Sequence, residues 1–244
     1  MVYIYTVYIT KGGVFLEKHD TLLMEPVAYI KNAYKEKFGV PRQSGLAPSV
    51  KSVIEFCEGF RDENCIRDIE QYSHLWLLWG FSENDKQWSP TVRPPRLGGN
   101  KRVGVFATRS PFRPNPVGLS CVKLENVEDS PKGKILVVSG CDLVDGTPIY
   151  DIKPYLPYVD SVETARGGFS DIHKNDFLEV EIPEELKCKL SQSQCNSIIE
   201  VLSLDPRPSY QDDEERVYGL AFDDFQVKFR YTQNKIVVCD IVRG

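Results

Sequence analysis

The segment 89–119 holds the side chains whose chemistry is most evident. It reads SPTVRPPRLGGNKRVGVFATRSPFRPNPVGL and has six basic residues and no acidic one, although the whole chain carries a formal net charge of −5. These basic residues are Arg93, Arg96, Lys101, Arg102, Arg109 and Arg113. The donor fork of a guanidinium matches phosphate and carboxylate, so arginines on loops usually bind one of these groups. A solvated, proline-stiffened surface loop is the alternative, and charge alone leaves both open.

Prolines and glycines follow one another closely in the same segment. Proline fixes φ and glycine frees it, so this spacing excludes a long helix and breaks any strand into short pieces. We therefore expect a set of shaped loops around the short apolar run at 103–107, displayed on a scaffold built by the rest of the chain.

The composition is typical of an ordinary globular protein. Hydrophobic residues make up 41% and charged residues 27% of 244 residues, which is enough for one large domain or two modest ones. Apolar runs of membrane-spanning length are absent from the sequence, so we expect no membrane partner. The first residues, MVYIYTVYIT, lack the basic start and the cleavage site of a signal peptide and predict a strand.

The cysteines and histidines do not have the spacing of a metal site. Seven cysteines are scattered without a CxxC pair, and three histidines are equally dispersed, so we expect no zinc. Reduced cysteines that act as small core side chains indicate the cytoplasm. Signatures of a Rossmann nucleotide site, a P-loop, an α/β-hydrolase and a zincin are also missing.

Short strands dominate the predicted scaffold. The first twenty residues suggest a hairpin around Lys11-Gly12-Gly13. Further strands are predicted at 52–57, 74–81, 120–125, 134–139 and 148–153. A helix is predicted at 62–71, capped by Asp62. The continuous apolar run at 74–81 predicts a strand buried on both faces, with Trp76 and Trp79 in the core rather than stacking on bases.

These strands follow one another with turn signals between them and no amphipathic helix. The pattern argues against a parallel α/β sheet and for a closed or nearly closed antiparallel β-barrel. Residues 183–202 then predict one broken or two short helices, and strands are predicted at 177–182, 218–222, 225–231 and 236–242. The predicted domains are an N-terminal hairpin extension at 1–23, a mainly β barrel at 24–160, a linker at 161–175 and a small α+β domain at 176–244.

Two classes of function fit an acidic protein with one basic, loop-built face. The first is an enzyme that acts on nucleic acid or on a phosphorylated substrate, and the second is a non-catalytic binding module of barrel type. Polar, turn-building loops that converge on a second ligand, besides the one bound by the basic face, would favour the enzyme. The segments 41–43, 82–83 and 145–148 have that character.

Five strings of residues resemble the TrmO family, also called YaeB-like or TsaA-like. They are VPRQ at 40–43, SHLW at 73–76, SPTVRPPRLGGN at 89–100, GVFATRSPFRPNPVGLS at 104–120 and DLVDGTPIYDIKPYLPY at 142–158. DPRPSY at 205–210 is similar to the C-terminal domain of the bacterial members. The resemblance covers about residue 24 to the C-terminus. It implies a tRNA methyltransferase that uses S-adenosylmethionine to methylate N6 of threonylcarbamoyladenosine at position 37, beside the anticodon.

The resemblance also implies a fold, an assembly and a set of site residues. Family members have a small β-barrel rather than a Rossmann domain, bind the cofactor in loops and commonly form homodimers. On matching positions, the cofactor contacts implied are Pro41, Arg42, Gln43, Ser82, Glu83, Arg109, Leu119, Asp145, Gly146, Thr147 and Pro148. The basic residues Arg93, Arg96, Lys101, Arg102 and Arg113 are expected to bind the anticodon arm of the tRNA.

Methyl transfer from a sulfonium needs few catalytic side chains, because the electrophile is already activated and positioning supplies much of the acceleration. The acceptor N6 belongs to a urea-like group and is a poor nucleophile while it keeps its proton. A base is therefore expected, and Asp151 with Lys153 on the same strand face is the candidate. A structural ion pair at the barrel mouth is the alternative for these two residues.

Overall fold

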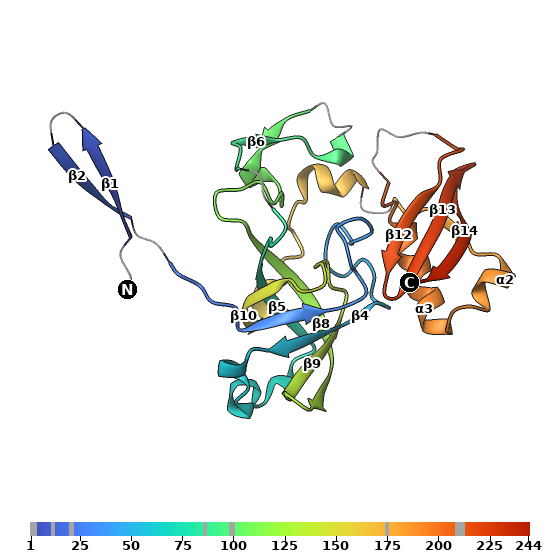
Figure 1. The fold of residues 1–244 in the computed structure, drawn as a ribbon, viewed down its shortest axis with the longest axis horizontal. Helices are drawn as coiled ribbons and strands as arrows, with labels where there is room; N and C mark the ends of the chain where they lie inside the picture. The colour runs from blue at the N-terminus through green and yellow to red at the C-terminus, as the bar shows by residue number, and fades with distance from the viewer. Residues whose placement is uncertain are drawn as a thin grey trace.

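A ring-like sheet of six antiparallel strands forms the centre of the molecule (Figure 1). The computed structural model describes residues 4–10, 13–19, 22–84, 87–97, 101–173, 176–207 and 213–244. The ring runs in the order β10-β3-β4-β9-β8-β5. Its strands are β3 (Ala28–Lys31), β4 (Lys51–Phe56), β5 (His74–Gly80), β8 (Val117–Ser130), β9 (Gly133–Ser139) and β10 (Pro148–Pro154). This mainly β, non-Rossmann architecture confirms the predicted fold class.

Alternation of buried and exposed side chains explains why β5 closes around a core. Leu75 and Leu77 are fully buried and Trp79 is 7% exposed, whereas the residues between them face outward. The prediction that β5 is buried on both faces is therefore wrong. Trp79 lies in the core as expected, but Trp76 lies on the outer face, where its Nε1 donates to the Asp160 carboxylate at 3.0 Å.

The predicted helix at 62–71 is two short 3₁₀ turns, η2 (Glu63–Ile66) and η3 (Ile69–Gln71). Asp62 caps the first turn as expected, because its side chain accepts from the backbone N–H of Asn64 at 2.9 Å. Asp68 between the turns has φ of 66°, a left-handed conformation that an α-helix cannot contain. The backbone at Asp68 therefore overrides the helical pattern.

A second sheet builds the C-terminal part of the chain, in the order β11-β14-β13-β12. Its strands are β11 (Glu179–Glu181), β12 (Tyr218–Phe222), β13 (Phe225–Thr232) and β14 (Lys235–Arg243), and its helices are α2 (Glu184–Lys187) and α3 (Gln192–Ser203). Ser191 and Gln194 form a capping box that starts α3, and its buried side chains pack into the same core as the sheet. The two short helices and the α+β character agree with the sequence prediction.

The remaining elements are short connections and an N-terminal hairpin. The hairpin pairs β1 (Ile4–Thr10) with β2 (Gly13–His19) and stands apart from the ring (Figure 1). Of its predicted turn, Gly13 begins β2, while Lys11 and Gly12 lie outside the described residues. The others are η1 (Glu58–Phe60), β6 (Thr91–Val92), η4 (Pro95–Leu97), β7 (Val103–Gly104), η5 (Val105–Ala107), α1 (Pro157–Asp160) and η6 (Gly168–His173). Within the described residues, no helix is long and apolar enough to cross a membrane.

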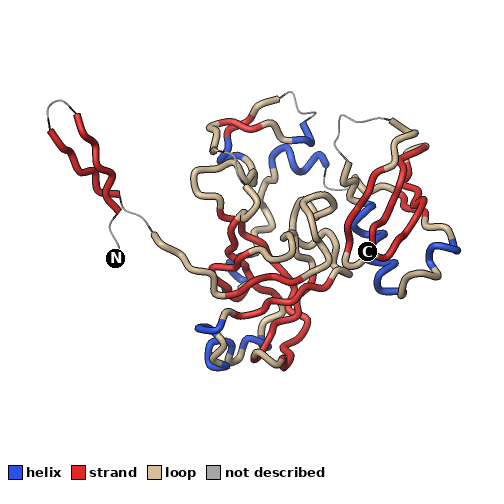
Figure 2. The backbone as a smooth tube through the Cα atoms, in the orientation of Figure 1, coloured by secondary structure: helices blue, strands red, loops and turns tan. Residues whose placement is uncertain are grey.

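The long connection between β3 and β4 joins the ring to the C-terminal sheet (Figure 2). Tyr34, Ala47 and Val50 of this connection are buried in one hydrophobic core with α3 and β12–β14. The Tyr34 ring meets the Phe222 ring edge-on with centroids 6.0 Å apart, and the two residues form an isolated antiparallel bridge. The loop that carries the VPRQ string is thus folded against the C-terminal part of the chain.

Candidate functional site

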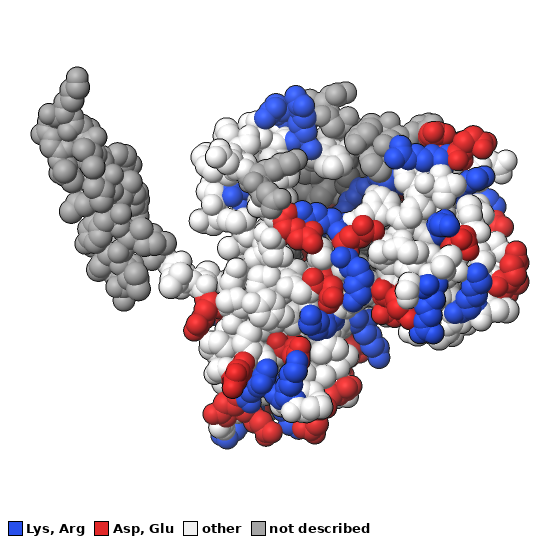
Figure 3. Space-filling view, viewed as in Figure 1, with Lys and Arg blue, Asp and Glu red and all other residues white. Residues whose placement is uncertain are grey.

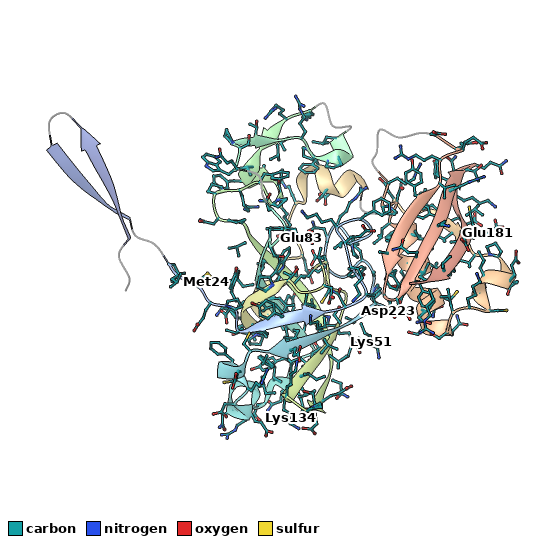
Figure 4. All side chains as sticks on the ribbon, in the orientation of Figure 1. Met24, Lys51, Glu83, Lys134, Glu181 and Asp223 are labelled. Carbon is teal, nitrogen blue, oxygen red and sulfur yellow. The ribbon has the colours of Figure 1, made fainter. Side chains whose placement is uncertain are left out.

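A pocket of about 260 Å³ lies where the end of β5 meets the loops on one side of the ring. Figure 4 shows Glu83, one of its residues, between the β6–β7 region and the ring. The lining residues are Lys37, Val40, Trp79, Gly80, Phe81, Ser82, Glu83, Asn84, Pro111, Phe112, Asp142, Val144 and Thr147. Four separate segments converge here, and the wall is mostly apolar with two carboxylates and one lysine.

Three side chains make a polar chain along one side of this pocket. The indole Nε1 of Trp79 donates to Ser120 Oγ at 2.9 Å, and the Ser120 hydroxyl donates to Asp142 Oδ1 at 2.5 Å. Ser120 is fully buried and Trp79 nearly so, whereas Asp142 is partly exposed to the pocket. A carboxylate held in this way has one defined orientation.

Gly118 makes room for the first member of this chain. Gly118 on β8 pairs with Trp79 on β5, and a Cβ at position 118 would lie 2.2 Å from the indole ring. Real Cβ atoms do not approach that closely, so only glycine at this position lets the indole lie flat on the neighbouring strand.

Burial raises the pKa of the Asp142 carboxyl above the ordinary aspartate value. The hydrogen bond from Ser120 and the positive charge of Arg109 act in the opposite direction. Desolvation is the largest effect, so Asp142 binds a proton more readily than an exposed aspartate does.

Lys37 and Glu83 lie opposite each other on the pocket wall. Lys37 Nζ lies 3.6 Å from a Glu83 carboxylate oxygen and also donates to the Glu83 backbone carbonyl. Both side chains are largely exposed, at 64% and 47%, so this ion pair adds little stability. It does link the loop after β3 to the loop after β5.

The VPRQ loop and the ATRS loop meet through side chains. Arg109 Nη1 donates to Gln43 Oε1 at 2.5 Å, and Pro41 is buried beside the pocket residue Val40. Arg42 is exposed and donates to the Asp205 carbonyl at 3.1 Å. Of the eleven residues expected to contact the cofactor, Ser82, Glu83 and Thr147 line the pocket directly.

The turn at 145–148 has a structural use for its polar groups. Asp145 Oδ1 accepts from the Asn32 backbone N–H at 3.0 Å, and Oδ2 lies 3.1 Å from Lys35 Nζ. Gly146 has φ of 78° and donates its N–H to the Ile30 carbonyl, so the turn anchors the end of β3. Thr147 is buried, and Pro148 begins β10.

Leu119, another expected cofactor contact, faces away from the pocket. It alternates with the buried Gly118 and Ser120 along β8, so its side chain faces the outside of the ring and is 53% exposed. The pocket of a single chain therefore does not include it.

Asp151 and Lys153 form an ion pair on β10, with Lys153 Nζ 2.7 Å from Asp151 Oδ2. Their side chains are 43% and 70% exposed, and neither lines the pocket. The two lie on one strand face, as expected from their spacing.

Three basic residues of 89–119, Arg93, Lys101 and Arg102, directly follow β6 or precede β7. Figure 3 shows one small lysine or arginine patch at the top of the view, and further such side chains lower on the same face. Arg93 and Lys101 are exposed, and Arg102 is exposed with its Nε bonded to Thr91 Oγ1 at 2.8 Å. Arg113 Nη1 donates to the Thr108 carbonyl at 3.1 Å, which stiffens the ATRS loop. The side chain of Arg96 lies outside the described residues.

Reasoning from the sequence missed the residues that join the pocket from outside the quoted turns. They are Lys37, Asn84, Phe112, Ser120 and Asp142. Asp142 starts the string DLVDGTP and sits only three residues before the expected turn, which was a usable signal. Among the residues that the structure describes, no group of three or more His, Cys, Asp and Glu could hold a metal ion.

Comparison with known proteins decides the family. A family model described as the tRNA-methyltransferase O N-terminal domain matches residues 29–161, and one described as the TrmO C-terminal domain matches residues 175–244. This chain belongs to the TrmO family. The resemblance seen in the sequence is therefore confirmed.

Several relatives align with this chain over most of its length. It is 42% identical over 217 residues to the tRNA (adenine(37)-N6)-methyltransferase of Escherichia coli, covering 85% of this chain and 92% of the relative. It is 40% identical to a putative S-adenosylmethionine-dependent methyltransferase, RcsF, of Pseudomonas aeruginosa, covering 91% and 98%. The crystal structure of TrmO from Pseudomonas aeruginosa superposes with a TM-score of 0.73 at 35% identity, covering 91% and 99%.

Proposed function

We propose that this protein is an S-adenosylmethionine-dependent tRNA methyltransferase that methylates N6 of adenine 37, and that its substrate nucleoside is N6-threonylcarbamoyladenosine. One observation carries the proposal: both parts of the chain match the TrmO family. The relative from Escherichia coli, aligned over 92% of its own length, is named for this activity. The second relative is named as dependent on S-adenosylmethionine.

The pocket supports this cofactor by its chemistry. S-adenosylmethionine carries an ammonium, a sulfonium, a carboxylate and an adenosine, and when bound it supplies an activated methyl group. Glu83 offers negative charge to the cationic groups, and Phe81 and Phe112 offer apolar surface. The charge of Arg109 reaches Asp142, so a guanidinium is also near enough to attract a carboxylate.

The expected cofactor contacts keep their roles in the proposal. Ser82, Glu83 and Thr147 bind from the pocket wall, and Gln43 and Arg109 bind as a hydrogen-bonded pair beside it. Asp145 and Gly146 act by anchoring the turn.

The substrate nucleoside lies in the single-stranded anticodon loop, so a base can enter a pocket without opening a duplex. The basic residues Arg93, Arg96, Lys101, Arg102 and Arg113 hold the phosphates of the anticodon arm, which gives affinity without sequence information. The pocket loops then recognise the threonylcarbamoyl group, which has a carboxylate of its own.

The protein acts as a cytoplasmic homodimer in this proposal. Leu119 supports the dimer: it is an expected cofactor contact and yet is 53% exposed outside the pocket of its own chain. A second copy of the chain would bring such a side chain to the cofactor of its neighbour. Sedimentation at several concentrations of the wild type and of Leu119→Asp tests this point, and a monomeric wild type overturns it.

Mass spectrometry of tRNA nucleosides tests the function. Purified protein and cofactor are incubated with two matched substrates, the same tRNA with and without the threonylcarbamoyl group. We expect one added methyl group on the modified nucleoside and no transfer to the unmodified tRNA. Equal transfer to both rejects the threonylcarbamoyl substrate. Binding of cofactor and tRNA without transfer makes the protein a non-catalytic binding module.

A further inference from the structure

Asp142 is the more buried of the two acids in the pocket. Among the lining residues only Glu83 and Asp142 are acidic. Glu83 is half-exposed, and its carboxylate faces Lys37. Asp142 lies deeper and has no lysine or arginine in a salt bridge among the described residues. The two acids therefore differ in environment, a difference that can separate their functions.

The orientation of Asp142 is fixed from behind. Ser120 donates to Oδ1, and Trp79 in turn donates to Ser120. Both residues belong to the ring strands β8 and β5, whose pairing is continuous at this level. A side chain fixed by rigid strands can present its carboxylate to the pocket without first being ordered by a ligand.

The charged groups around Asp142 compensate the negative charge of its carboxylate only in part. Arg109 from the ATRS loop is the positive charge that acts on it, and Lys37 and Glu83 line the same pocket. Two further titratable groups lie behind it, Cys141 and Tyr34. Burial raises the pKa of the Cys141 thiol to about 12 and raises the pKa of the Tyr34 phenol as well, so both are neutral at physiological pH.

We infer that Asp142 is the general base that takes the N6 proton of the threonylcarbamoyladenosine substrate. This inference rests on the proposed function. As the N6–H bond breaks, the proton passes to Asp142. The nitrogen electron pair forms the N–C bond to the methyl group, while the methyl carbon–sulfur bond breaks and leaves its pair on sulfur. The neutral carboxylic acid then returns its proton to water after the product leaves.

Asp142 suits this task better than Asp151. The Asp151 carboxylate is paired with Lys153 at 2.7 Å on an exposed strand face and does not line the pocket. Burial raises the pKa of the Asp142 carboxyl and so makes Asp142 a stronger base than an exposed aspartate. The carboxylate must also reach the proton that it removes. If the substrate adenine enters the pocket, only a residue that lines the pocket can reach its N6 proton.

Single-turnover rates and cofactor affinity are measured together on three variants. Asp142→Asn keeps the size of the side chain and its ability to accept from Ser120. Asp151→Asn removes the competing candidate. Asp129→Asn is the matched control, because Asp129 is exposed and pairs with Lys134 at the far end of the β8–β9 hairpin.

We expect Asp142→Asn to lower the methyl-transfer rate constant by about 10²- to 10⁴-fold, the usual contribution of a general base. Its affinity for S-adenosylmethionine, measured by calorimetry, should stay within about threefold of wild type, a factor small beside the loss in rate. Asp129→Asn should behave as wild type. If Asp142→Asn keeps a rate within tenfold of wild type, or loses cofactor binding in proportion to activity, Asp142 is not the base. A comparable rate loss in Asp151→Asn alone assigns the role to Asp151 and also overturns the inference.

A pH series and a direct titration give readouts that a purely structural role would not move. The wild-type rate should fall with unit slope as pH drops through the Asp142 pKa, because protonation removes the base. The residual rate of Asp142→Asn should not show this fall at low pH. The rate of Glu83→Gln should still show it.

Carbon-13 NMR spectra of protein labelled at aspartate follow the titration of the Asp142 carboxyl directly. Its signal is assigned as the one that is missing from the spectrum of Asp142→Asn. The titration midpoint of this signal should lie above that of ordinary aspartates, and a midpoint at or below theirs argues against the inference. This measurement needs no substrate. Failure of the proposed function, seen as an inactive wild type, is thereby distinguished from failure of the assignment of Asp142.

Discussion

Arg42 of the VPRQ loop donates a hydrogen bond to the backbone carbonyl of Asp205, which lies 163 positions later in the chain, at 3.1 Å. The Asp205 carboxylate holds Arg207 through two bonds of 2.8 and 3.0 Å, and the Arg207 guanidinium lies 3.4 Å from the centroid of the Tyr231 ring. Asp205 and Arg207 therefore attach the C-terminal sheet to the predicted cofactor loop. In Figure 4, Asp223 marks this junction, and its N–H donates to the Ala33 carbonyl.

Glu200 fastens the same loop from α3. Its carboxylate accepts from both the backbone N–H and the hydroxyl of Ser49, at 2.8 and 2.7 Å. Glu200→Ala removes the acceptor, so we expect a loss of about 1.5–3 kcal/mol in the free energy of unfolding, measured by urea titration. Cofactor affinity should fall as well, because the loop that carries Gln43 loses an anchor. Glu185→Ala, at an exposed position of α2, is the control, and equal stability of the two variants contradicts this role.

Arg109→Ala should weaken cofactor binding about ten- to a hundredfold, since a charge-assisted contact is worth roughly 1.5–3 kcal/mol. Gln43→Ala should have a smaller effect, because it removes only the partner that orients Arg109. Calorimetric titration with S-adenosylmethionine measures both. Arg67→Ala, an exposed arginine on the opposite loops, should bind as wild type. Unchanged affinity in a folded Arg109→Ala protein removes this residue from the site.

Neutral substitutions of Arg93, Lys101 and Arg102 should weaken tRNA binding while cofactor affinity stays the same. Each phosphate contact releases counterions, so each loss should shallow the log–log salt dependence by about 0.7–0.9. Filter binding across a salt series measures the slope. Lys134→Gln, at the end of the ring far from the β6–β7 region in Figure 4, should leave the slope unchanged. Slopes that remain the same in every arginine variant mean that the segment is a solvated loop.

Gly118→Ala should destabilise the protein by about 1–3 kcal/mol, because the added methyl meets the Trp79 ring and forces it to move. The displaced indole should also lose its bond to Ser120 and disturb Asp142. Gly104→Ala is a matched control, since a Cβ there meets nothing within 4 Å. Denaturant unfolding of the two variants tests this, and equal midpoints would show that the indole adapts at no cost.

Removing residues 1–21 should leave methyl transfer intact. The family model begins at residue 29, after the hairpin β1–β2. Circular dichroism checks that the shortened chain folds, and the nucleoside assay measures its activity. A folded but inactive chain would mean that the hairpin takes part in catalysis, for example through a second copy.

Local patterns determined most of the strands. Alternating or continuous apolar residues at 52–57, 134–139 and 225–231 correctly placed β4, β9 and β13, and the Asp145-Gly146 turn formed where its residue types require. Neighbouring residues carry all of that information, since side-chain period and turn chemistry are local. The long motif strings also identified the family, because they keep residue types in order along the chain.

Packing between distant segments decided the rest. Whether a tryptophan on β5 faced in or out depended on segments more than forty positions away, so Trp79 reached Ser120 on β8 while Trp76 reached Asp160 on α1. The burial of Tyr34 depended on Phe222, and the conformation of Asp68 overrode a helical pattern. Asp142, in the loop between β9 and β10, entered the pocket only because the fold brings that loop to the end of β5, beside Ser120 of β8. Such contacts join residues that are far apart in sequence, and their energies depend on the complete fold rather than on any local pattern.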